Sequence, residues 1–337
     1  MKKVSVIIPC FNATKYLPKC FMSLVQQTIG IDQIELIFVD DASTDEDATW
    51  NMLQEFERAY PESIKILKLE ENMRQGGARN VALQYATGEY IAFVDADDFV
   101  SENFLLETYE KAKESDADII QFEYFYYTDR LGAVDSGRNI TPEVIEISSV
   151  SDRKRFLISE KVTYGCWNKL YRHTLLNEAH TAYAEHVIYE EPLFVYPLLY
   201  FANKIVILND AYYYYRQNDS GTMRNDMRQE ETLKMHADVQ LAVWNFMKKT
   251  PFFKEYYDEI KLYFLHTYLY ETLYFAKLRD FKPSYAFYKE LEKTVITEVP
   301  DYDESTYSAL IPKQMELYRM IEEGMTEEKF GGYCERL

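Results

Sequence analysis

Three carboxylates follow an apolar run in the stretch YIAFVDADDF, residues 90–99. Asp95, Asp97 and Asp98 carry hard oxygen donors, and Mg²⁺ or Mn²⁺ needs only one or two such protein ligands when phosphate oxygens and water complete its coordination. A metal ion held in this way could stabilise a departing diphosphate. The same DADD turn (95–98) also suits a solvated acidic turn or the N-cap of a following helix, so the turn alone does not decide.

Another candidate carboxylate, Asp41, follows an earlier apolar run. IELIFVD (34–40) leads to Asp41, and VSVIIP (4–9) leads to Phe11. Because ligands of open α/β sheets bind at the carboxyl ends of the strands, we expect these residues to lie beside the DADD turn. Phe11 could form the wall of a nucleobase site, and Asp41 could accept a hydrogen bond from the edge of the base. Capping of the next helix by Asp41 or by the hydroxyl groups of Ser43 and Thr44 is an equally good interpretation.

A glycine pair opens a third polar segment, NMRQGGARNVAL (72–83), in which Gly76 and Gly77 precede Arg79. By itself this segment is typical of any loop-to-helix junction with an exposed arginine. The three polar segments occur in order after neighbouring strands, and together they predict a nucleotide-sugar site.

Short apolar runs rich in β-branched and aromatic residues position these segments. They recur through the first 128 residues with helical spacing between them, which indicates βαβ units and a mostly parallel, Rossmann-like sheet flanked by helices. The runs lie at 4–9, 34–40, 64–69, 90–95 and 118–125. There is no GxGxxG and no GxxxxGK[ST] sequence, which argues against a dinucleotide site and a P-loop.

Composition excludes several classes of protein. The chain has 337 residues, 47% of them apolar and 28% charged, which predicts a substantial core. Its formal net charge of −19 disfavours binding to nucleic acid or to an anionic membrane surface. The four cysteines show neither disulfide nor zinc spacing. No apolar stretch is long enough for a transmembrane helix. We therefore expect a cytoplasmic protein, and peripheral association with the inner face of a membrane stays open.

The pattern changes twice along the chain. Residues 129–150 suggest an irregular excursion or hairpin, and a helical, acidic pattern begins near 226. We predict a domain at 1–220, with a nucleotide-sugar half at 1–128 and an acceptor half at 129–220, followed by a helical region at 221–337. The helical region could complete the core, form a homo-oligomer interface or present a platform for the acceptor.

The motifs resemble those of family 2 glycosyltransferases with the GT-A fold. The resemblance spans roughly residues 3–217 and rests on VSVIIPCFN, IELIFVDDASTD, GGARNVALQYATGEYIAFVDADD, WNKLYR and YEEPLF. It implies a bacterial-type, inverting hexosyltransferase that uses a UDP-sugar with Mn²⁺ or Mg²⁺. The acceptor would be a glycan or a lipid-linked glycan of a surface polysaccharide or glycoconjugate.

The resemblance also implies a set of donor-binding residues, namely Pro9, Phe11, Asp41, Arg79, Asp95 and Arg216. In that set Phe11, Asp41 and Arg79 would face the uracil, Asp95 would hold the ribose or sugar, and Arg216 would close over the diphosphate. Asp97 would be the metal ligand. Ser220 could assist at the diphosphate.

The general base is assigned from the same resemblance. Glu191 matches the position of the family base, and Glu190 is its rival. Because Glu191 precedes Pro192, a plain helix start with a carboxylate in its first turn is the alternative interpretation. Trp167 and Lys169 could border the sugar or the acceptor. The chain departs from the family where Arg74 takes a position that is often glycine.

Two other functions remain as alternatives. A nucleotidyltransferase also combines a parallel sheet with an Asp-bound metal, but its usual glycine-rich, basic loop is missing from PCFNATKYL. A non-catalytic nucleotide-sugar-binding protein of the same fold is the other alternative.

Overall fold

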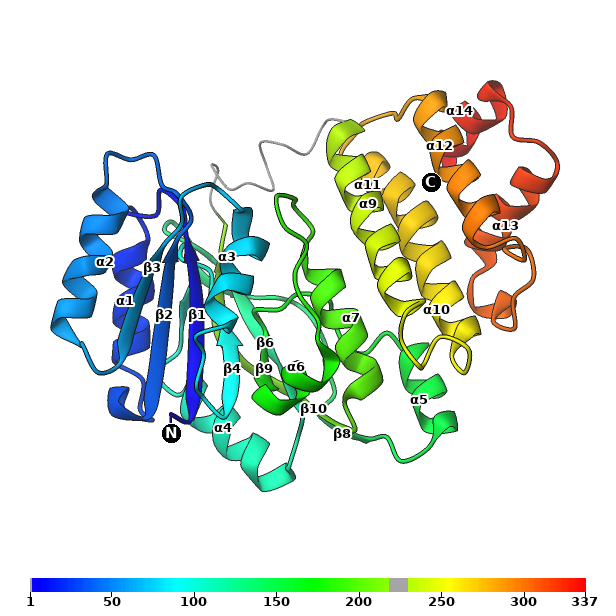
Figure 1. Ribbon diagram of the computed structural model, residues 1–337. Helices are drawn as coiled ribbons and strands as arrows, with labels where there is room; N and C mark the ends of the chain where they lie inside the picture. Colours follow the sequence, from blue (N-terminus) through cyan, green and yellow to red (C-terminus); the bar gives the residue numbers. More distant parts are fainter. Residues whose placement is uncertain (1, 218–229) are drawn as a thin grey trace. The chain divides into compact units, whose positions relative to one another are not determined.

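The computed structural model describes residues 2–217 and 230–337. The chain divides into two compact units, Met1–Asn218 and Asp219–Leu337. The first unit is α/β and the second is helical (Figure 1). Ser220, which was expected to assist at a diphosphate, lies outside the described residues.

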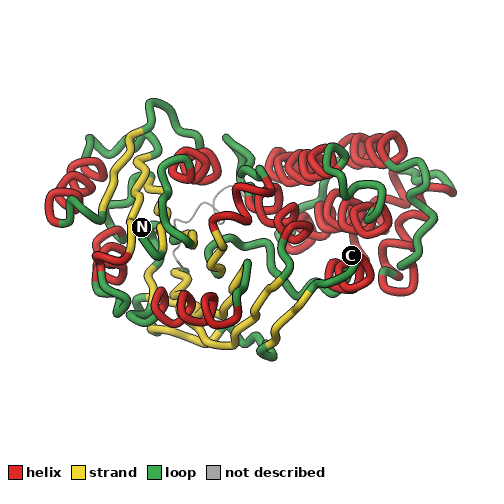
Figure 2. The backbone as a smooth tube through the Cα atoms, turned by 60° about the horizontal axis from the view of Figure 1, so that its bottom comes forward, coloured by secondary structure: helices red, strands yellow, loops and turns green. Residues whose placement is uncertain are grey.

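The first unit is built on one ten-stranded sheet with the order β3-β2-β1-β4-β9-β6-β10-β5, in which β7 pairs with β6 and β8 pairs with β10. The strands are β1 (Val4–Cys10), β2 (Ile34–Asp40), β3 (Ile64–Lys68), β4 (Tyr90–Phe93), β5 (Phe99–Val100), β6 (Ile119–Thr128), β7 (Gly132–Asp135), β8 (Glu143–Glu146), β9 (Lys169–Arg172) and β10 (Lys204–Arg216). Figure 2 shows the strands curling through this unit with helices on both sides.

The direction of the strands places the polar segments together at the carboxyl ends of the strands. Strands β1 to β4 are parallel, and β10 is parallel to β6. The predicted α/β fold is thus confirmed, although β5, β7, β8 and β9 add antiparallel pairings. The excursion at 129–150 supplies β7 and β8, which pair with different strands rather than with each other.

Helices cover both faces of the sheet. They are α1 (Leu17–Val25), α2 (Ala48–Ala59), α3 (Arg74–Leu83), α4 (Phe104–Ser115), α5 (Val150–Leu157), α6 (His173–Ala179) and α7 (Glu191–Phe201), with a 3₁₀ turn at Ile31–Gln33. Helices α1 and α2 lie on one face of β1 to β3, and α3 lies on the other (Figure 1). Because both faces are covered, every residue of β1 is buried, which explains its unbroken apolar run.

The second unit is helical throughout its described length. It contains α9 (Glu230–Met247), α10 (Tyr257–Phe264), a π-helical segment (Leu265–Glu271), α11 (Thr272–Leu278), α12 (Tyr285–Glu298), a 3₁₀ turn (Ser308–Leu310), α13 (Pro312–Glu322) and α14 (Glu327–Arg336). Trp244 is buried and stacks on Phe264, with ring centroids 4.8 Å apart. The predicted role of this unit in oligomerisation stays a prediction.

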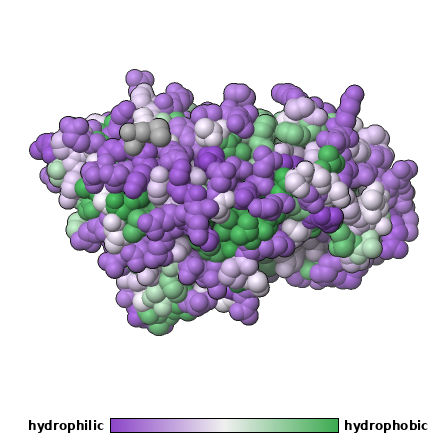
Figure 3. All heavy atoms as spheres, turned by 90° about the horizontal axis from the view of Figure 1, so that it is seen from below, coloured by the Kyte–Doolittle hydropathy of each residue, from purple (hydrophilic) through white to green (hydrophobic). Residues whose placement is uncertain are grey.

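Hydrophilic residues dominate the molecular face seen in Figure 3, as the acidic composition leads one to expect. Within residues 2–217 and 230–337, none of the helices is both long enough and apolar enough to cross a bilayer.

Candidate active site

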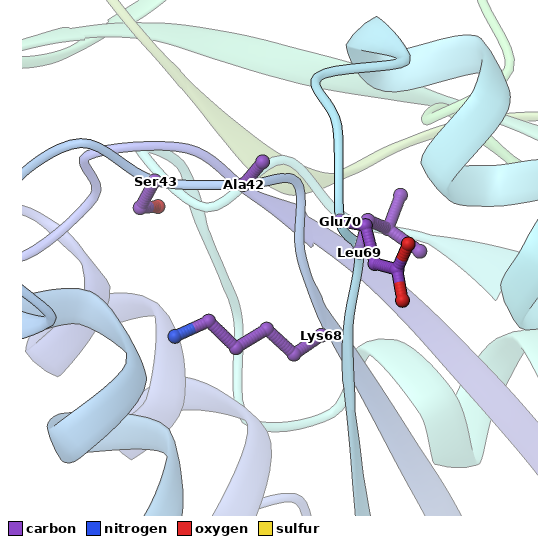
Figure 4. A pocket seen from close by; sticks show the side chains of 5 residues that line it. All are labelled: Ala42, Ser43, Lys68, Leu69 and Glu70. Atoms are coloured by element: carbon purple, nitrogen blue, oxygen red, sulfur yellow. The ribbon is translucent and has the colours of Figure 1, made fainter.

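An open pocket lies at the carboxyl ends of β2 and β3. It has a volume of about 610 Å³ and is lined by Ala42, Ser43, Lys68, Leu69 and Glu70. Figure 4 shows Lys68 and Glu70 pointing in opposite directions from this segment, while Ala42 and Ser43 lie on the facing loop. Asp41 directly precedes Ala42 in the chain.

Asp41 is buried. Its Oδ1 accepts a hydrogen bond from the backbone N–H of Met73 at 2.7 Å. Burial raises the pKa of Asp41 to about 6, and the hydrogen bond from Met73 opposes that rise. Helix α2 has Asp47 at its N-cap without a side-chain hydrogen bond, so the capping interpretation of the DDAST segment was wrong.

Phe11 stands at the end of β1 with 47% of its surface exposed. The next residue, Asn12, has a φ of +49° and donates its backbone N–H to Ser43 Oγ at 3.0 Å, which joins the turns after β1 and β2. An exposed aromatic ring on a braced turn can stack on a flat ligand. Pro9 is buried inside β1 opposite Val39, so it contributes to the strand rather than to an exposed surface.

The three aspartates of the DADD turn have different surroundings. Asp98 is buried, and its two oxygens accept hydrogen bonds from the backbone N–H of Arg216 at 2.6 Å and from the hydroxyl group of Tyr213 at 2.7 Å. Asp95 and Asp97 are only partly buried. The N-cap position of α4 makes no side-chain hydrogen bond, so the helix-cap interpretation of this turn was also wrong.

Arg79 links the DADD turn to the glutamate pair. Its side chain is 1% exposed, Nη2 lies 2.7 Å from Asp95 Oδ1, and Nη1 forms an ion pair with Glu190 Oε1. The sequence predicted a contact between Arg79 and the uracil, whereas in the structure both terminal nitrogens of Arg79 contact carboxylates. A buried arginine between two carboxylates fixes their distance.

Two neighbours of Arg79 on α3 hold the segment that leads to the glutamates. A Cβ atom on Gly76 would lie 2.2 Å from the carbonyl oxygen of Ala184 and 3.0 Å from Glu190 Cγ, so glycine is required for this approach. Asn80 brackets Tyr183, donating Nδ2 to its carbonyl oxygen at 3.0 Å and accepting its N–H at 2.8 Å. The GGARN segment had suggested a ligand contact. Its packing against the segment that leads to the glutamates was missed.

The helix start at α7 separates the two glutamates. Glu190 is the N-cap residue and is paired with Arg79, whereas Glu191 is in the first turn. Glu191 Oε1 accepts a hydrogen bond from the backbone N–H of Cys166 at 2.8 Å. Burial, with the charge of Glu190 beside it, raises the pKa of Glu191 to about 7. A carboxylate with that pKa suits general base catalysis at neutral pH.

Arg216 is the last residue of β10, and its side chain contacts the DADD turn. Its Nε donates to the carbonyl oxygen of Asp97 at 2.8 Å, and its Nη1 lies 2.6 Å from Asp129 Oδ1. The rings of Tyr16 and Tyr127 lie 4.6 and 5.0 Å from its guanidinium carbon. The structure thus places Arg216 next to the DADD turn in a braced position, and its closure over the diphosphate stays a prediction.

The two candidate residues of the WNKLYR motif are enclosed to different degrees, and Trp167 is only partly buried. Trp167 stacks on Tyr215 with ring centroids 5.4 Å apart and packs edge-on against Tyr124. Lys169 is fully buried. A border to the sugar stays a prediction for Trp167, but the burial of Lys169 removes it from the surface that a ligand could reach.

The DADD turn suits a divalent cation that takes most of its ligands from elsewhere. Asp98 has both oxygens engaged, Asp95 has one oxygen paired with Arg79, and Asp97 is a partly exposed hard oxygen donor in the same turn. Over the described residues, no group of three or more His, Cys, Asp or Glu side chains could enclose a metal ion. Such a set fits Mg²⁺ or Mn²⁺ completed by diphosphate and water.

Residues 5–179 match the family model described as glycosyl transferase family 2. The chain belongs to this family, and it is a glycosyltransferase. That assignment excludes the nucleotidyltransferase alternative. Arg74 has a φ of +60°, which explains why the family often has glycine at this position.

Curated relatives match about two thirds of the chain. The glycosyltransferase GlyG of Streptococcus pneumoniae is 31% identical over 66% of this chain and 73% of its own length. The poly(ribitol-phosphate) beta-N-acetylglucosaminyltransferase TarS of Staphylococcus aureus is 30% identical over 66% of this chain, which spans only 36% of TarS. The chain is therefore related to glycosyltransferases of teichoic acid and polysaccharide synthesis.

Solved structures of TarS residues 1–349 have a similar fold. The complex with UDP superimposes with a TM-score of 0.69 at 22% identity, covering 98% of this chain and 89% of that one. The complex with UDP-GlcNAc gives a TM-score of 0.61, also at 22% identity, over 94% and 92% of the two chains.

Proposed function

We propose that this glycosyltransferase moves a sugar from a UDP-sugar to a hydroxyl group of a glycan or lipid-linked glycan, with inversion at the anomeric carbon. The arrangement around Glu191 carries the proposal. One carboxylate has a pKa near 7, is oriented by the Cys166 N–H, and is joined to the DADD turn through Glu190 and Arg79. A base and a diphosphate site on one rigid frame are what a single displacement needs.

The donor nucleotide is proposed to bind at the ends of β1, β2 and β3. Exposed Phe11 would stack on the uracil, and Asp41 would accept a hydrogen bond from its edge beside the 610 Å³ pocket. The structural similarity to the TarS complexes with UDP and UDP-GlcNAc supports a UDP-sugar donor for this chain. The sugar itself is not assigned.

Asp97 is proposed to hold Mg²⁺ or Mn²⁺. When bound, the ion would supply positive charge to the diphosphate that leaves. The protein would add Arg216, which is fixed beside the turn by its bond to the Asp97 carbonyl oxygen. Asp95, already oriented by Arg79, would accept hydrogen bonds from the ribose or the sugar.

Glu191 is proposed to remove the proton from the acceptor hydroxyl. The acceptor oxygen forms the new bond to the anomeric carbon, the bond between that carbon and the diphosphate oxygen breaks, and UDP keeps the electron pair. The proton stays on the Glu191 carboxylate. Glu190 is the poorer candidate because its Oε1 is engaged by the guanidinium group of buried Arg79.

Titration calorimetry tests the donor assignment. UDP, GDP and NAD would each be titrated into the full chain with and without Mn²⁺, followed by UDP release from a panel of UDP-sugars. Metal-dependent binding of UDP alone, with turnover of at least one donor, is expected. Preference for GDP would overturn the donor nucleotide, and binding without any turnover would favour the non-catalytic alternative.

A further inference from the structure

Lys169 is a fully buried lysine that the proposed reaction does not use. It opens β9, and its side chain is 0% exposed. Nζ donates hydrogen bonds to the carbonyl oxygen of Gly165 at 2.6 Å, to Asn168 Oδ1 at 2.8 Å and to Thr163 Oγ1 at 2.9 Å. An ammonium group has three N–H donors, and each of them has a partner here.

All three partners belong to one short loop, residues 163–168. The start of the loop is also tied to β6, because the Thr163 N–H donates to Gln121 Oε1 at 2.9 Å. The end of the loop is tied to the same strand, since Asn168 Nδ2 donates to the carbonyl oxygen of Phe122 at 3.2 Å. Lys169 therefore fills the space that the loop encloses and fixes its middle at Gly165.

The next residue in the loop is Cys166, whose backbone N–H holds Glu191 Oε1 at 2.8 Å. The chain of contacts runs from the Lys169 ammonium to the Gly165 carbonyl group, through one peptide to the Cys166 N–H, and from there to the carboxylate. A change in the orientation of that peptide would turn the N–H away from Glu191.

A buried ammonium among neutral acceptors is an unfavourable choice for stability alone. Burial lowers the pKa of Lys169 to about 7. An apolar side chain of similar length would avoid the desolvation of a charge, and such replacements are often neutral or stabilising when the polar partners can be satisfied otherwise. Because the buried ammonium carries a desolvation cost, we infer that the role of Lys169 is to hold the loop through its hydrogen bonds.

We propose that Lys169 is a positioning residue for the base: its ammonium group holds the 163–168 loop so that the Cys166 N–H orients the Glu191 carboxylate. This inference rests on the proposed function, because it takes Glu191 to be the base. Lys169 itself does not touch a substrate.

Lys169→Met tests the proposal in the full chain, since methionine keeps much of the volume and removes the donors. UDP release would be followed without added acceptor, so that water takes its place, using the UDP-sugar that the parent enzyme turns over fastest. We expect kcat to fall on the order of 10- to 100-fold, because a misplaced base loses most of its effect. The Kd for UDP should stay within about 2-fold, because the donor contacts lie elsewhere.

The pH profile separates positioning from a general loss of packing. Glu190 and Asp95 raise the pKa of Glu191, while Arg79 and the Cys166 N–H lower it. Lys169 is a further cation whose charge interacts with Glu191. Lys169→Met should therefore move the acidic limb of kcat to higher pH through both the lost charge and the lost Cys166 hydrogen bond, whereas Thr163→Val keeps the charge and should move the limb through the hydrogen bond alone. A purely structural effect would lower kcat at every pH without moving the limb.

Two further variants complete the experiment. Thr163→Val removes one acceptor of Lys169 with little change of shape, and it should show the same pattern to a smaller extent if Lys169→Met does not fold. Lys161→Met is the matched control, because Lys161 is exposed and pairs with Glu143 outside the loop.

An unchanged kcat in Lys169→Met, or in Thr163→Val should Lys169→Met fail to fold, would overturn the proposal. A proportional loss of kcat and UDP affinity with an unmoved pH limb would also overturn it, because that result describes general damage. If the parent enzyme binds UDP but releases none from any donor, the proposed function fails and this inference fails with it. The parent enzyme thus reports on the function, and the variants report on Lys169.

Discussion

Arg79 and Glu190 form a buried ion pair between residues 111 positions apart in the sequence. The same guanidinium group holds Asp95 at 2.7 Å, so one side chain sets the separation between the DADD turn and the start of α7. The charge of Glu190 adds to the burial that raises the pKa of Glu191. The ion pair thereby gives the two adjacent glutamates different roles.

Replacement of Arg79 by methionine should be strongly destabilising. It leaves Asp95 and Glu190 without their partner in a buried site, and breaking buried pairs in this way costs about 3–5 kcal/mol. Urea denaturation would measure the loss. Arg155→Met is the matched control, because Arg155 is exposed and its pair with Asp152 is worth roughly 0–1 kcal/mol. Equal losses in the two variants would refute the bridging role.

Glu191→Gln and Glu190→Gln should separate the base from its neighbour. The first variant should bind UDP with the parent affinity and lose UDP release by on the order of 10²- to 10⁴-fold, since general base catalysis contributes about that much. The second should lose stability, because it breaks the pair with Arg79. Residual turnover in Glu191→Gln together with an inactive but folded Glu190→Gln would move the base by one position.

The raised pKa of Glu191 also predicts a pH dependence of stability. The native carboxyl group, with a pKa of about 7, keeps its proton at pH values where the unfolded one, near 4.5, has lost it. Unfolding free energy should therefore fall as pH rises from about 4.5 to about 7. Glu191→Gln lacks this fall and should be more stable than the parent at pH 8, by roughly 3 kcal/mol. Urea denaturation at pH 5 and pH 8 would show whether the difference grows with pH.

Adjacent aspartates of the DADD turn should behave differently. Asp97→Ala should abolish the effect of Mn²⁺ on UDP binding and leave the fold intact, because Asp97 is the proposed metal ligand. Asp98→Ala removes the acceptor of the Arg216 N–H and the Tyr213 hydroxyl group and should lower stability by roughly 2 kcal/mol or more. Identical calorimetric traces for Asp97→Ala and the parent, with and without Mn²⁺, would contradict the metal assignment.

Gly76→Ala should push the glutamate segment away from α3. The new methyl group would meet the Ala184 carbonyl oxygen at 2.2 Å, so the backbone must move. Overpacking of this kind costs about 1–3 kcal/mol, and displacement of the base should lower UDP release by on the order of 10²-fold. Gly332→Ala in α14 is the control, because its methyl group finds ordinary contacts and alanine favours a helix by about 1 kcal/mol. Full activity in Gly76→Ala would show that the close approach is dispensable.

Much of the first unit could be predicted because its central strands are buried on both faces. The expected runs at 4–9, 34–40 and 64–69 coincide closely with β1, β2 and β3, and Asp41 and Phe11 lie at their ends. Burial on both faces produces unbroken apolar runs, which a single sequence displays directly. The polar residues lie at the carboxyl ends of the strands, and the parallel direction of those strands brings these ends together.

The remaining features depend on contacts that no local pattern encodes. Strand β9 has only four residues, KLYR, and its insertion between β4 and β6 follows from pairing rather than periodicity. Arg79 looked like a ligand contact because nothing in GGARN reveals that Glu190 will arrive beside it. The Cys166 N–H carries no side-chain signal at all, since any residue except proline supplies that donor.

The position of β9 also affects how the protein is made. Strand β4 is completed on one side by β1 and on the other by β9, whose residues 169–172 leave the ribosome long after Phe93. At about 5–20 residues per second, synthesis of residues 94–172 takes roughly 4–16 s. During that time the nascent chain carries an unpaired apolar strand edge, which is a template for pairing with other chains. The N-terminal half therefore exposes the edge of β4 until the segment that covers it has been translated.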